Sequence, residues 1–389
     1  MFRRQTSLTY WIIFGLVLRL LLIPFSSHSD TRGHYLGSYF IVQKGAFFSL
    51  YDYISRLPAE NPIFQMYGPK FLVYSPVTYW FHSLVLLVEK PFFPWSLYEK
   101  LIVDYGAAVS SPGYWFLQYL LKIPYLFVDL GCLYLLFKLV DKNKWTLATA
   151  LWALNIPLFY SAYLMGQFDI LIIFFWLLAL YFIKQRWLSV AAVAVGLSAG
   201  FKPFGLFFLP LLPGSMFKNT LVGGVTYLAI ISPYIFSSGY RQSALIAQQS
   251  DKMLFAKIWG LPVFILLLGL LYLYRLIKKT RFTWELLAIP LLFFYSVTHY
   301  HPQWFSWISP FLILFLAGYP RLRFPVICLV LLNILIIFSF DYTLNFGLFG
   351  IRYELFTHQE ALISLIRTAI ASTSAYLIYS LYHHAPAQK

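Results

Sequence analysis

Long apolar segments separated by short polar ones make up most of the chain. An α-helix needs about 20 predominantly apolar residues to cross the hydrocarbon core of a bilayer. On this measure the pattern predicts membrane-spanning helices at 8–25, 114–138, 145–163, 168–183, 219–236, 258–277, 283–298, 303–318, 324–340 and 359–382. The first segment is too long for the core of a cleavable signal peptide, so we expect it to be retained. The fold class that follows is an all-α polytopic membrane protein.

The apolar segment 187–213 is interrupted at Lys202-Pro203. Proline lacks a backbone N–H and breaks a helix interior, so we expect two helical arms that meet at this point and begin and end on the same side. With this broken hairpin the chain has about twelve membrane helices. They form a single transmembrane domain over residues 1–389.

The region 26–113 is polar and aromatic, and it separates the first two predicted spans. We interpret it as a long first outer loop with short interfacial helices at 33–48 and 95–108, because aromatic side chains favour the headgroup level. Its apolar stretch 71–88 is expected to dip into the outer leaflet and return. If that stretch crossed the membrane, every later loop would change sides.

Composition and charge agree with a membrane protein. The chain is 60% hydrophobic and 11% charged, with a mean hydropathy of +0.71, whereas soluble domains contain about 25% charged residues. The net charge of +15 comes from basic clusters between spans, such as Lys138 to Lys144 and Arg275 to Arg281, rather than from one basic face. Membrane topology explains this distribution better than a nucleic-acid partner. It predicts a plasma-membrane (cell inner membrane) protein with both termini in the cytoplasm and the region 26–113 outside.

Charged groups within spans are costly, so they usually pair or mark a functional pathway. Arg19 in the first span and Asp129 in the second are expected to form an interhelical ion pair that orders the bundle. Four further groups of polar residues lie at span ends on the predicted outer side, where we expect them to line one cavity. They are Asp30; Gln167 and Asp169; Lys202; and His299 and His301, which end a span.

Simpler interpretations of these residues remain open. Asp169 is also suited to the N-terminus of a helix, where the helix dipole favours an acid. Lys202 is also able to extend to the membrane interface. His299 and His301 with Asp30 and Asp169 would suit a metal ion, but no third or fourth ligand shares the spacing of the histidines. No cofactor is certain from the sequence, and a divalent metal is left open.

Taken in order, several motifs resemble the GT-C superfamily of integral membrane glycosyltransferases, in particular its bacterial and archaeal mannosyltransferase-like branch. The likeness covers residues 1 to about 320. The motifs are Asp30, Tyr35, Gly45, Tyr51-Asp52, the Tyr-x-Pro-x-Thr segment from Tyr74 to Thr78, Gly166 to Asp169, Phe201 to Pro203 and His301 to Trp304. The chain departs from the superfamily in having one acid after the first span, where a pair is frequent, and Tyr74-Ser75-Pro76 in place of Tyr-Pro-Pro.

The resemblance implies a GT-C fold and an inverting transfer of a mannose-like hexose. The donor would be a polyprenyl-phosphate-linked sugar, and the acceptor a lipid or glycan at the outer face of the cell envelope. The carboxylate that acts on the acceptor matches Asp30, within the region 26–113. A donor that leaves as a phosphate also needs a cationic clamp, for which we assign Lys202 and His301, with Arg32 or Arg352. Sugar hydroxyls are assigned to Gln167 and Asp169, and more weakly to Tyr35 and Gln303.

Two rival functions use the same residues. A transporter or flippase of a lipid-linked saccharide would need the same aromatic cavity and basic groups without consuming the sugar. No repeat symmetry between the two halves is evident, although many transporters have it. A structural member of an envelope complex is the third interpretation. Release of free polyprenyl phosphate separates an enzyme from both.

Overall fold

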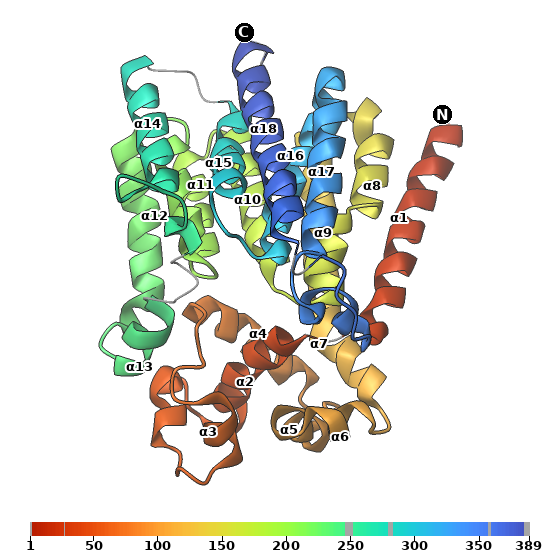
Figure 1. Ribbon diagram of the computed structural model, residues 1–389, viewed down its shortest axis with the longest axis vertical. Coiled ribbons are helices and arrows are strands. Elements are labelled where there is room, and N and C mark those ends of the chain that lie inside the picture. Colours follow the sequence, from red (N-terminus) through yellow and green to blue (C-terminus); the bar gives the residue numbers. More distant parts are fainter. Residues whose placement is uncertain (1, 27, 246–251, 279–282, 357–358, 385–389) are drawn as a thin grey trace.

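The computed structural model describes residues 2–26, 28–245, 252–278, 283–356 and 359–384. A bundle of helices lies above a layer of shorter ones, and the N and C ends both lie at the end of the bundle away from that layer (Figure 1). The α-helices of the bundle are α1 (Phe2–Leu22), α7 (Tyr114–Leu139), α8 (Trp145–Ala153), α9 (Ile156–Leu158), α10 (Asp169–Lys184), α11 (Leu188–Ala199), α12 (Met216–Ile231), α14 (Val263–Lys278), α15 (Ile289–Val297), α16 (Ser309–Gly318), α17 (Arg323–Ile337) and α18 (Glu360–His384). The predicted all-α membrane class is confirmed.

Short helical turns connect or extend these helices. They are η1 (Ile23–Phe25), η4 (Lys142–Lys144), the π-helix η5 (Phe159–Leu164), η6 (Pro203–Leu211), η7 (Ser232–Tyr234), α13 (Ser238–Tyr240), η8 (Arg241–Leu245), η10 (Trp284–Leu287), η11 (Pro302–Ile308), η12 (Pro320–Leu322), η13 (Tyr342–Leu344) and η14 (Phe346–Phe349). A small antiparallel hairpin, β1 (Lys257–Ile258) and β2 (Leu261–Pro262), precedes α14. The predicted span 258–277 is therefore helical only from Val263, because the tight turn at Trp259-Gly260 has positive φ at both residues.

Residues 28–113 form the layer at one end of the bundle, which we call the cap layer (Figure 1). It contains α2 (Ser29–Lys44), η2 (Leu50–Asp52), η3 (Ile54–Arg56), α3 (Pro62–Tyr67), α4 (Pro76–Glu89), α5 (Trp95–Val103) and α6 (Tyr105–Val109). The helix predicted at 33–48 begins earlier, at Ser29, because the His28 side chain accepts a hydrogen bond from the backbone N–H of Asp30 and so caps the helix. This earlier start places Asp30 in the first turn of α2.

The number of membrane crossings is only partly settled by helix length. Four described helices are long and apolar enough to cross a membrane, at Thr6–Phe25, Tyr114–Leu139, Pro320–Ile337 and Glu360–His383. A fifth results if the pair Lys142–Ala153 and Ile156–Leu164, bent by 43°, counts as one span. The total of about twelve membrane helices stays a prediction.

The predicted break at Lys202 is present in the structure. Helix α11 ends at Ala199, Lys202 has extended backbone, and the 3-10 helix η6 returns alongside α11. Gly205 makes this return possible, because a Cβ at that position would lie 2.4 Å from the Ser198 Oγ atom. The hairpin therefore presents Lys202 at its tip.

The expected ion pair between Arg19 and Asp129 is confirmed. The Arg19 Nε atom lies 2.5 Å from an Asp129 oxygen, and both side chains are fully buried. Asp129 also accepts hydrogen bonds from Trp152 (2.6 Å) and Tyr163 (2.8 Å). Because these four residues come from α1, α7, α8 and η5, the pair ties the N-terminal helices together.

Helix α7 runs from the cap layer to the end of the bundle where the termini lie, so the basic cluster from Lys138 to Lys144 lies at that end (Figure 1). Residues 279–282 of the second basic cluster lie outside the described residues. Which side of the membrane each end faces stays a prediction.

Candidate active site

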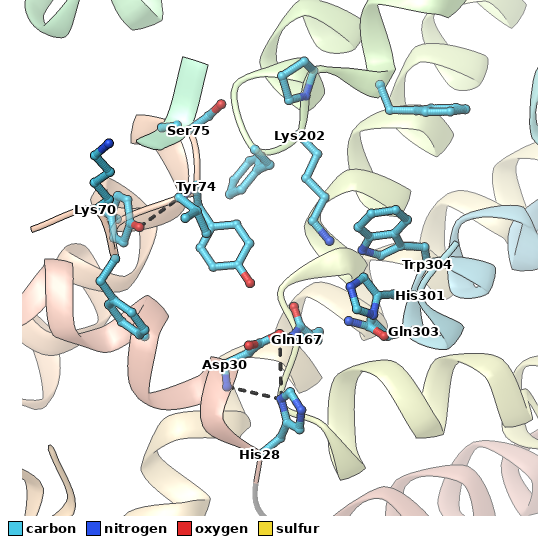
Figure 2. Close-up of a pocket in the computed structure, with 18 of the residues that line it drawn as sticks. His28, Asp30, Lys70, Tyr74, Ser75, Gln167, Lys202, His301, Gln303 and Trp304 are labelled. Atoms are coloured by element: carbon cyan, nitrogen blue, oxygen red, sulfur yellow. Dashed lines mark hydrogen bonds and ion pairs between the residues drawn. The ribbon is translucent and has the colours of Figure 1, made fainter. Parts of the chain in front are cut away.

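A cavity of about 760 Å³ lies where the cap layer meets the bundle. A volume of several hundred Å³ is typical of sites for small organic ligands. Five of the residues singled out in the sequence line it together: Asp30, Gln167, Lys202, His301 and Gln303. They come from the start of α2, the loop before α10, the broken hairpin, the residue before η11 and η11 itself. Their side chains converge on the same space (Figure 2).

Asp30 is held in place but remains accessible. The Gln167 side-chain amide donates a hydrogen bond to an Asp30 oxygen, and the Nδ1 atom of His28 lies 3.7 Å from that oxygen. About a third of the Asp30 side chain is exposed. Burial lowers the pKa of the His28 imidazole, so it is neutral at pH 7 and its Nδ1 atom accepts the hydrogen bond that caps α2. Asp30 is thus an oriented carboxylate that faces the cavity.

The loop that carries Gln167 is shaped by a glycine. Gly166 has a φ of +66°, and a Cβ there would lie 2.3 Å from the Thr31 hydroxyl oxygen. That hydroxyl donates to the Met165 carbonyl over 2.9 Å, which ties the loop to α2. The loop therefore presents Gln167 directly to Asp30. The Gln167 Oε1 atom is buried and has no partner among the described residues.

Lys202 points into the cavity and forms an ion pair with Asp169, which is fully buried. Asp169 also accepts hydrogen bonds from Trp307 (2.9 Å) and Ser161 (3.2 Å), and it does not line the cavity. The aromatic rings of Phe168, Trp304 and Trp307 surround the Lys202 ammonium group at 5.0, 5.6 and 5.2 Å from their centroids. In this geometry Asp169 fixes Lys202, and Lys202 does not extend to the interface.

A second lysine, which the sequence analysis missed, lies beside His301. The Lys252 ammonium group hydrogen-bonds the His301 Nε2 atom and lies 5.8 Å from the Trp304 ring centroid. Burial, with a contribution from the Lys252 charge, lowers the pKa of His301 to about 4. Burial lowers the pKa of Lys252 to about 8. At pH 7 His301 is therefore neutral and accepts through Nε2, which leaves a buried Nδ1 atom without a partner among the described residues.

Four residues assigned to ligands in the sequence do not line the cavity: Asp169, which is paired with Lys202, and Arg32, Tyr35 and Arg352. The Arg32 guanidinium lies over the Tyr105 ring at 4.9 Å, inside the cap layer. The fully buried Tyr35 donates its hydroxyl to the Leu121 carbonyl over 3.1 Å. Arg352 is exposed outside the cavity. Residues share a face of a helix when they are three or four positions apart. Arg32 and Tyr35 are two and five positions from Asp30, so they lie on other faces of α2 than the face that lines the cavity.

Tyr74 is a further cavity residue to which the sequence gave no chemical role. Its hydroxyl points toward Asp30 and Gln167 (Figure 2). Burial, together with the negative charge of Asp30, raises the pKa of the Tyr74 phenol. The phenol therefore stays protonated and is able to donate a hydrogen bond. Tyr74 is the first residue of the Tyr-x-Pro-x-Thr motif, so the motif could have indicated it as a site residue.

The described residues contain no group of three or more His, Cys, Asp or Glu side chains arranged to hold a metal ion.

Comparison with known proteins adds one finding. The model of glycosyltransferase family 87, a family of the GT-C type, matches residues 107–237. This chain is a membrane glycosyltransferase. The matched third of the glycosyltransferase contains Gln167, Asp169 and Lys202, whereas Asp30 and His301 lie outside it. The resemblance to GT-C enzymes seen in the sequence is confirmed. Neither the curated proteins nor the solved structures contain a match to this glycosyltransferase.

Proposed function

We propose that the glycosyltransferase transfers a mannose-like hexose, with inversion, from a polyprenyl-phosphate-linked donor to a lipid or glycan acceptor at the outer face of the membrane. The observation that carries this proposal is the content of the cavity. The Asp30 carboxylate shares it with Lys202 and His301. The other carboxylate of the lining, Asp341, accepts hydrogen bonds from the backbone N–H and the hydroxyl of Thr343. A sugar joined to a lipid phosphate needs alignment, one base and stabilisation of the departing phosphate, and little else.

In the proposed reaction the acceptor hydroxyl oxygen attacks C1 of the donor sugar. The bond between C1 and the phosphate oxygen breaks, its electron pair stays on the phosphate, and polyprenyl phosphate leaves. The acceptor proton passes to Asp30, which acts as the general base. The hydrogen bond from Gln167 orients the Asp30 carboxylate for this step.

We assign the donor phosphate to the space between Lys202 and Lys252, beside Trp304. The Trp304 ring lies within 6 Å of both ammonium groups, so the two cations flank one place. Lysine binds phosphate as a point charge, and charged hydrogen bonds are the stronger ones. The unpartnered Nδ1–H of His301 supplies a further donor.

The sugar hydroxyls need acceptors, and two amide oxygens fit this need. The Oε1 atoms of Gln167 and Gln303 are buried and have no partner among the described residues. Unpaired buried acceptors cost free energy until a ligand satisfies them. The prenyl chain would follow part of the apolar lining, formed by Phe201, Phe204, Ala244, Leu245, Met253 and Phe294.

The test uses the purified full-length protein in lipid nanodiscs with a short-chain polyprenyl-phosphate mannose. We expect mannose transfer with release of free polyprenyl phosphate, and we expect Asp30→Asn to abolish both without lowering the unfolding temperature. Asp104→Asn is the matched control, because Asp104 caps α6 away from the cavity and asparagine caps a helix equally well. Normal turnover by Asp30→Asn would remove Asp30 from the mechanism. In sealed liposomes, movement of intact donor across the bilayer without release of polyprenyl phosphate would favour a transporter instead.

A further inference from the structure

A buried lysine in the middle of the molecule has no part in the reaction described above. Lys122, on helix α7, is fully buried, and none of the ion pairs among the described residues involves it. Its ammonium group instead faces five oxygen atoms. These are the carbonyls of Ser26 (2.6 Å), Tyr163 (3.0 Å), Ile23 (3.2 Å) and Leu164 (3.3 Å), and the Ser26 hydroxyl (3.3 Å).

The five oxygens belong to two chain segments. Ile23 and Ser26 lie at the end of α1 and η1, directly before the α2 turn that carries Asp30. Tyr163 and Leu164 end the π-helix η5, directly before the loop that carries Gln167. Carbonyls at helix C-termini lack partners within the helix, and a cation there is favoured by the helix dipole. One ammonium group therefore satisfies the ends of two helices at once.

The two segments also contact each other directly, beside Lys122. The Thr31 hydroxyl donates to the Met165 carbonyl over 2.9 Å. A Cβ at Gly166 would lie 2.3 Å from the Thr31 hydroxyl oxygen and 3.3 Å from the Lys122 Cε atom. The joint is packed too closely for any side chain at position 166. A change in the Lys122 contacts would thus shift both segments.

We propose that Lys122 is a positioning residue that holds the Asp30 turn and the Gln167 loop at hydrogen-bonding distance. This inference rests on the role proposed for Asp30. Loss of the ammonium group removes the donor that four carbonyls share in a buried place, and among the described residues only the Tyr163 carbonyl keeps a side-chain donor, the Ser26 hydroxyl at 3.3 Å. The segments that carry these carbonyls are then expected to move toward other donors. Asp30 then loses its alignment with the acceptor, while the phosphate site at Lys202 and Lys252 is untouched.

The kinetic test compares Lys122→Met and Thr31→Val with the unchanged protein, in nanodiscs, with the short-chain polyprenyl-phosphate mannose. A displacement of about 1 Å at a reacting group costs about 100-fold in rate. We expect kcat to fall by about that factor in Lys122→Met and by about tenfold in Thr31→Val, which removes one contact of the same joint. The KM for the donor should change by less than about threefold, because the lost interaction acts only in the transition state.

The matched control is Asn219→Leu. Asn219 is also buried, and its amide donates to the carbonyls of Leu212 and Pro213 (3.0 and 2.9 Å) at a loop that does not line the cavity. This variant loses stability without a change in kcat. Hydrogen–deuterium exchange gives a readout independent of activity. We expect faster exchange in peptides that cover 23–32 and 160–170 for Lys122→Met and Thr31→Val, but not for Asn219→Leu.

An unchanged kcat in folded Lys122→Met, or faster exchange spread over the whole bundle, would overturn the proposal. If Lys122→Met does not fold, the Thr31→Val result decides by the same criteria. If the unchanged protein transfers no sugar, the proposed donor or reaction is wrong, and the exchange pattern alone decides whether Lys122 joins the two segments.

Discussion

Lys202 and Lys252, whose ammonium groups both lie near the Trp304 ring, differ in how their charge is compensated. Lys202 is paired with the buried carboxylate of Asp169, whereas Lys252 hydrogen-bonds a neutral imidazole. A cation that already has an anionic partner attracts a phosphate less than one that has none. We therefore expect Lys252 to contribute more of the charge that attracts the donor phosphate, and Lys202 to fix where the phosphate binds.

This difference predicts two separable effects of changing Lys202. Lys202→Met leaves Asp169 as a buried carboxylate without a cation, which should destabilise the protein by about 3 kcal/mol and weaken donor use. The double variant Lys202→Met, Asp169→Leu removes both charges and should recover most of the unfolding temperature without recovering the donor KM. Thermal unfolding in detergent and steady-state kinetics measure the two quantities. Recovery of donor use in the double variant would show that Lys202 does not contact the donor.

Lys252 predicts a pH dependence of donor binding. With a pKa of about 8, Lys252 is charged below that pH and neutral above it. The two histidines that face it do not titrate near this pH, because burial lowers the pKa of His299 and of His301 to about 4. The phosphodiester of the donor keeps one negative charge throughout.

We therefore expect the KM for the donor to be constant below pH 8 and to rise above it by up to about tenfold per pH unit. Lys252→Met should have a high KM that no longer depends on pH in this range. A rise that persists in Lys252→Met would assign the titration to another group.

The site residues that could be predicted from the sequence were polar side chains at the ends of predicted spans. Polar groups at span ends are costly unless they serve a purpose, and this reasoning found Asp30, Gln167, Lys202 and His301. The same reasoning could not predict which residues of one helix face the cavity and which face away from it. The sequence alone did not show that α2 begins at Ser29, and without that boundary Arg32 and Tyr35 could not be assigned to faces other than that of Asp30. Lys252 was missed because it lies in a polar loop whose path depends on tertiary packing.

At the scale of elements, the close approach of η6 to α11 decides where Lys202 lies. A Cβ at position 205 would meet the Ser198 hydroxyl at 2.4 Å and the Ala199 nitrogen at 3.1 Å. Gly205→Ala must therefore push the two arms apart, at a cost of about 1–3 kcal/mol. Because the arms meet at Lys202, we also expect a higher KM for the donor.

Gly224→Ala is the matched control for that change. Gly224 lies within α12, and a Cβ there would have no atom within 4 Å. The control should keep both its unfolding temperature and its donor KM. Wild-type behaviour of Gly205→Ala in both measurements would mean that the arms adjust without moving Lys202.

Helix positions followed from the apolar pattern, but helix ends and types did not. Each predicted span contains helical structure, although 258–277 begins in a β-hairpin. The helices η6 and η11 are 3-10 helices that start at a proline, and η5 is a π-helix. These departures depend on how each turn packs against its neighbours. They also occur at the cavity, where η5 precedes Gln167 and η11 follows His301.

At the scale of the whole molecule, the cavity exists because one block of sequence covers one end of the bundle. Residues 28–113 form the cap layer, and the chain ends lie at the opposite end (Figure 1). Since both chain ends lie at the same end of the bundle, the chain passes through the bundle an even number of times. An even number agrees with the twelve helices predicted. It does not say which side of the membrane the cap layer faces; the distribution of basic residues favours the outer side.

Cysteine labelling tests this orientation directly. In a protein whose Cys132 and Cys328 are replaced by alanine, Ser110→Cys places a thiol on the exposed surface of the cap layer, and Lys142→Cys places one at the opposite end. A membrane-impermeant maleimide added to intact cells should label Ser110→Cys at once and Lys142→Cys only after permeabilisation. The two sites serve as controls for each other, since both side chains are exposed in the native protein. The opposite labelling pattern would place the cavity on the cytoplasmic side, where nucleotide sugars are available. The proposal of a lipid-linked donor at the outer face would then be wrong, although the roles of Asp30 and Gln167 as base and orienting group would stand.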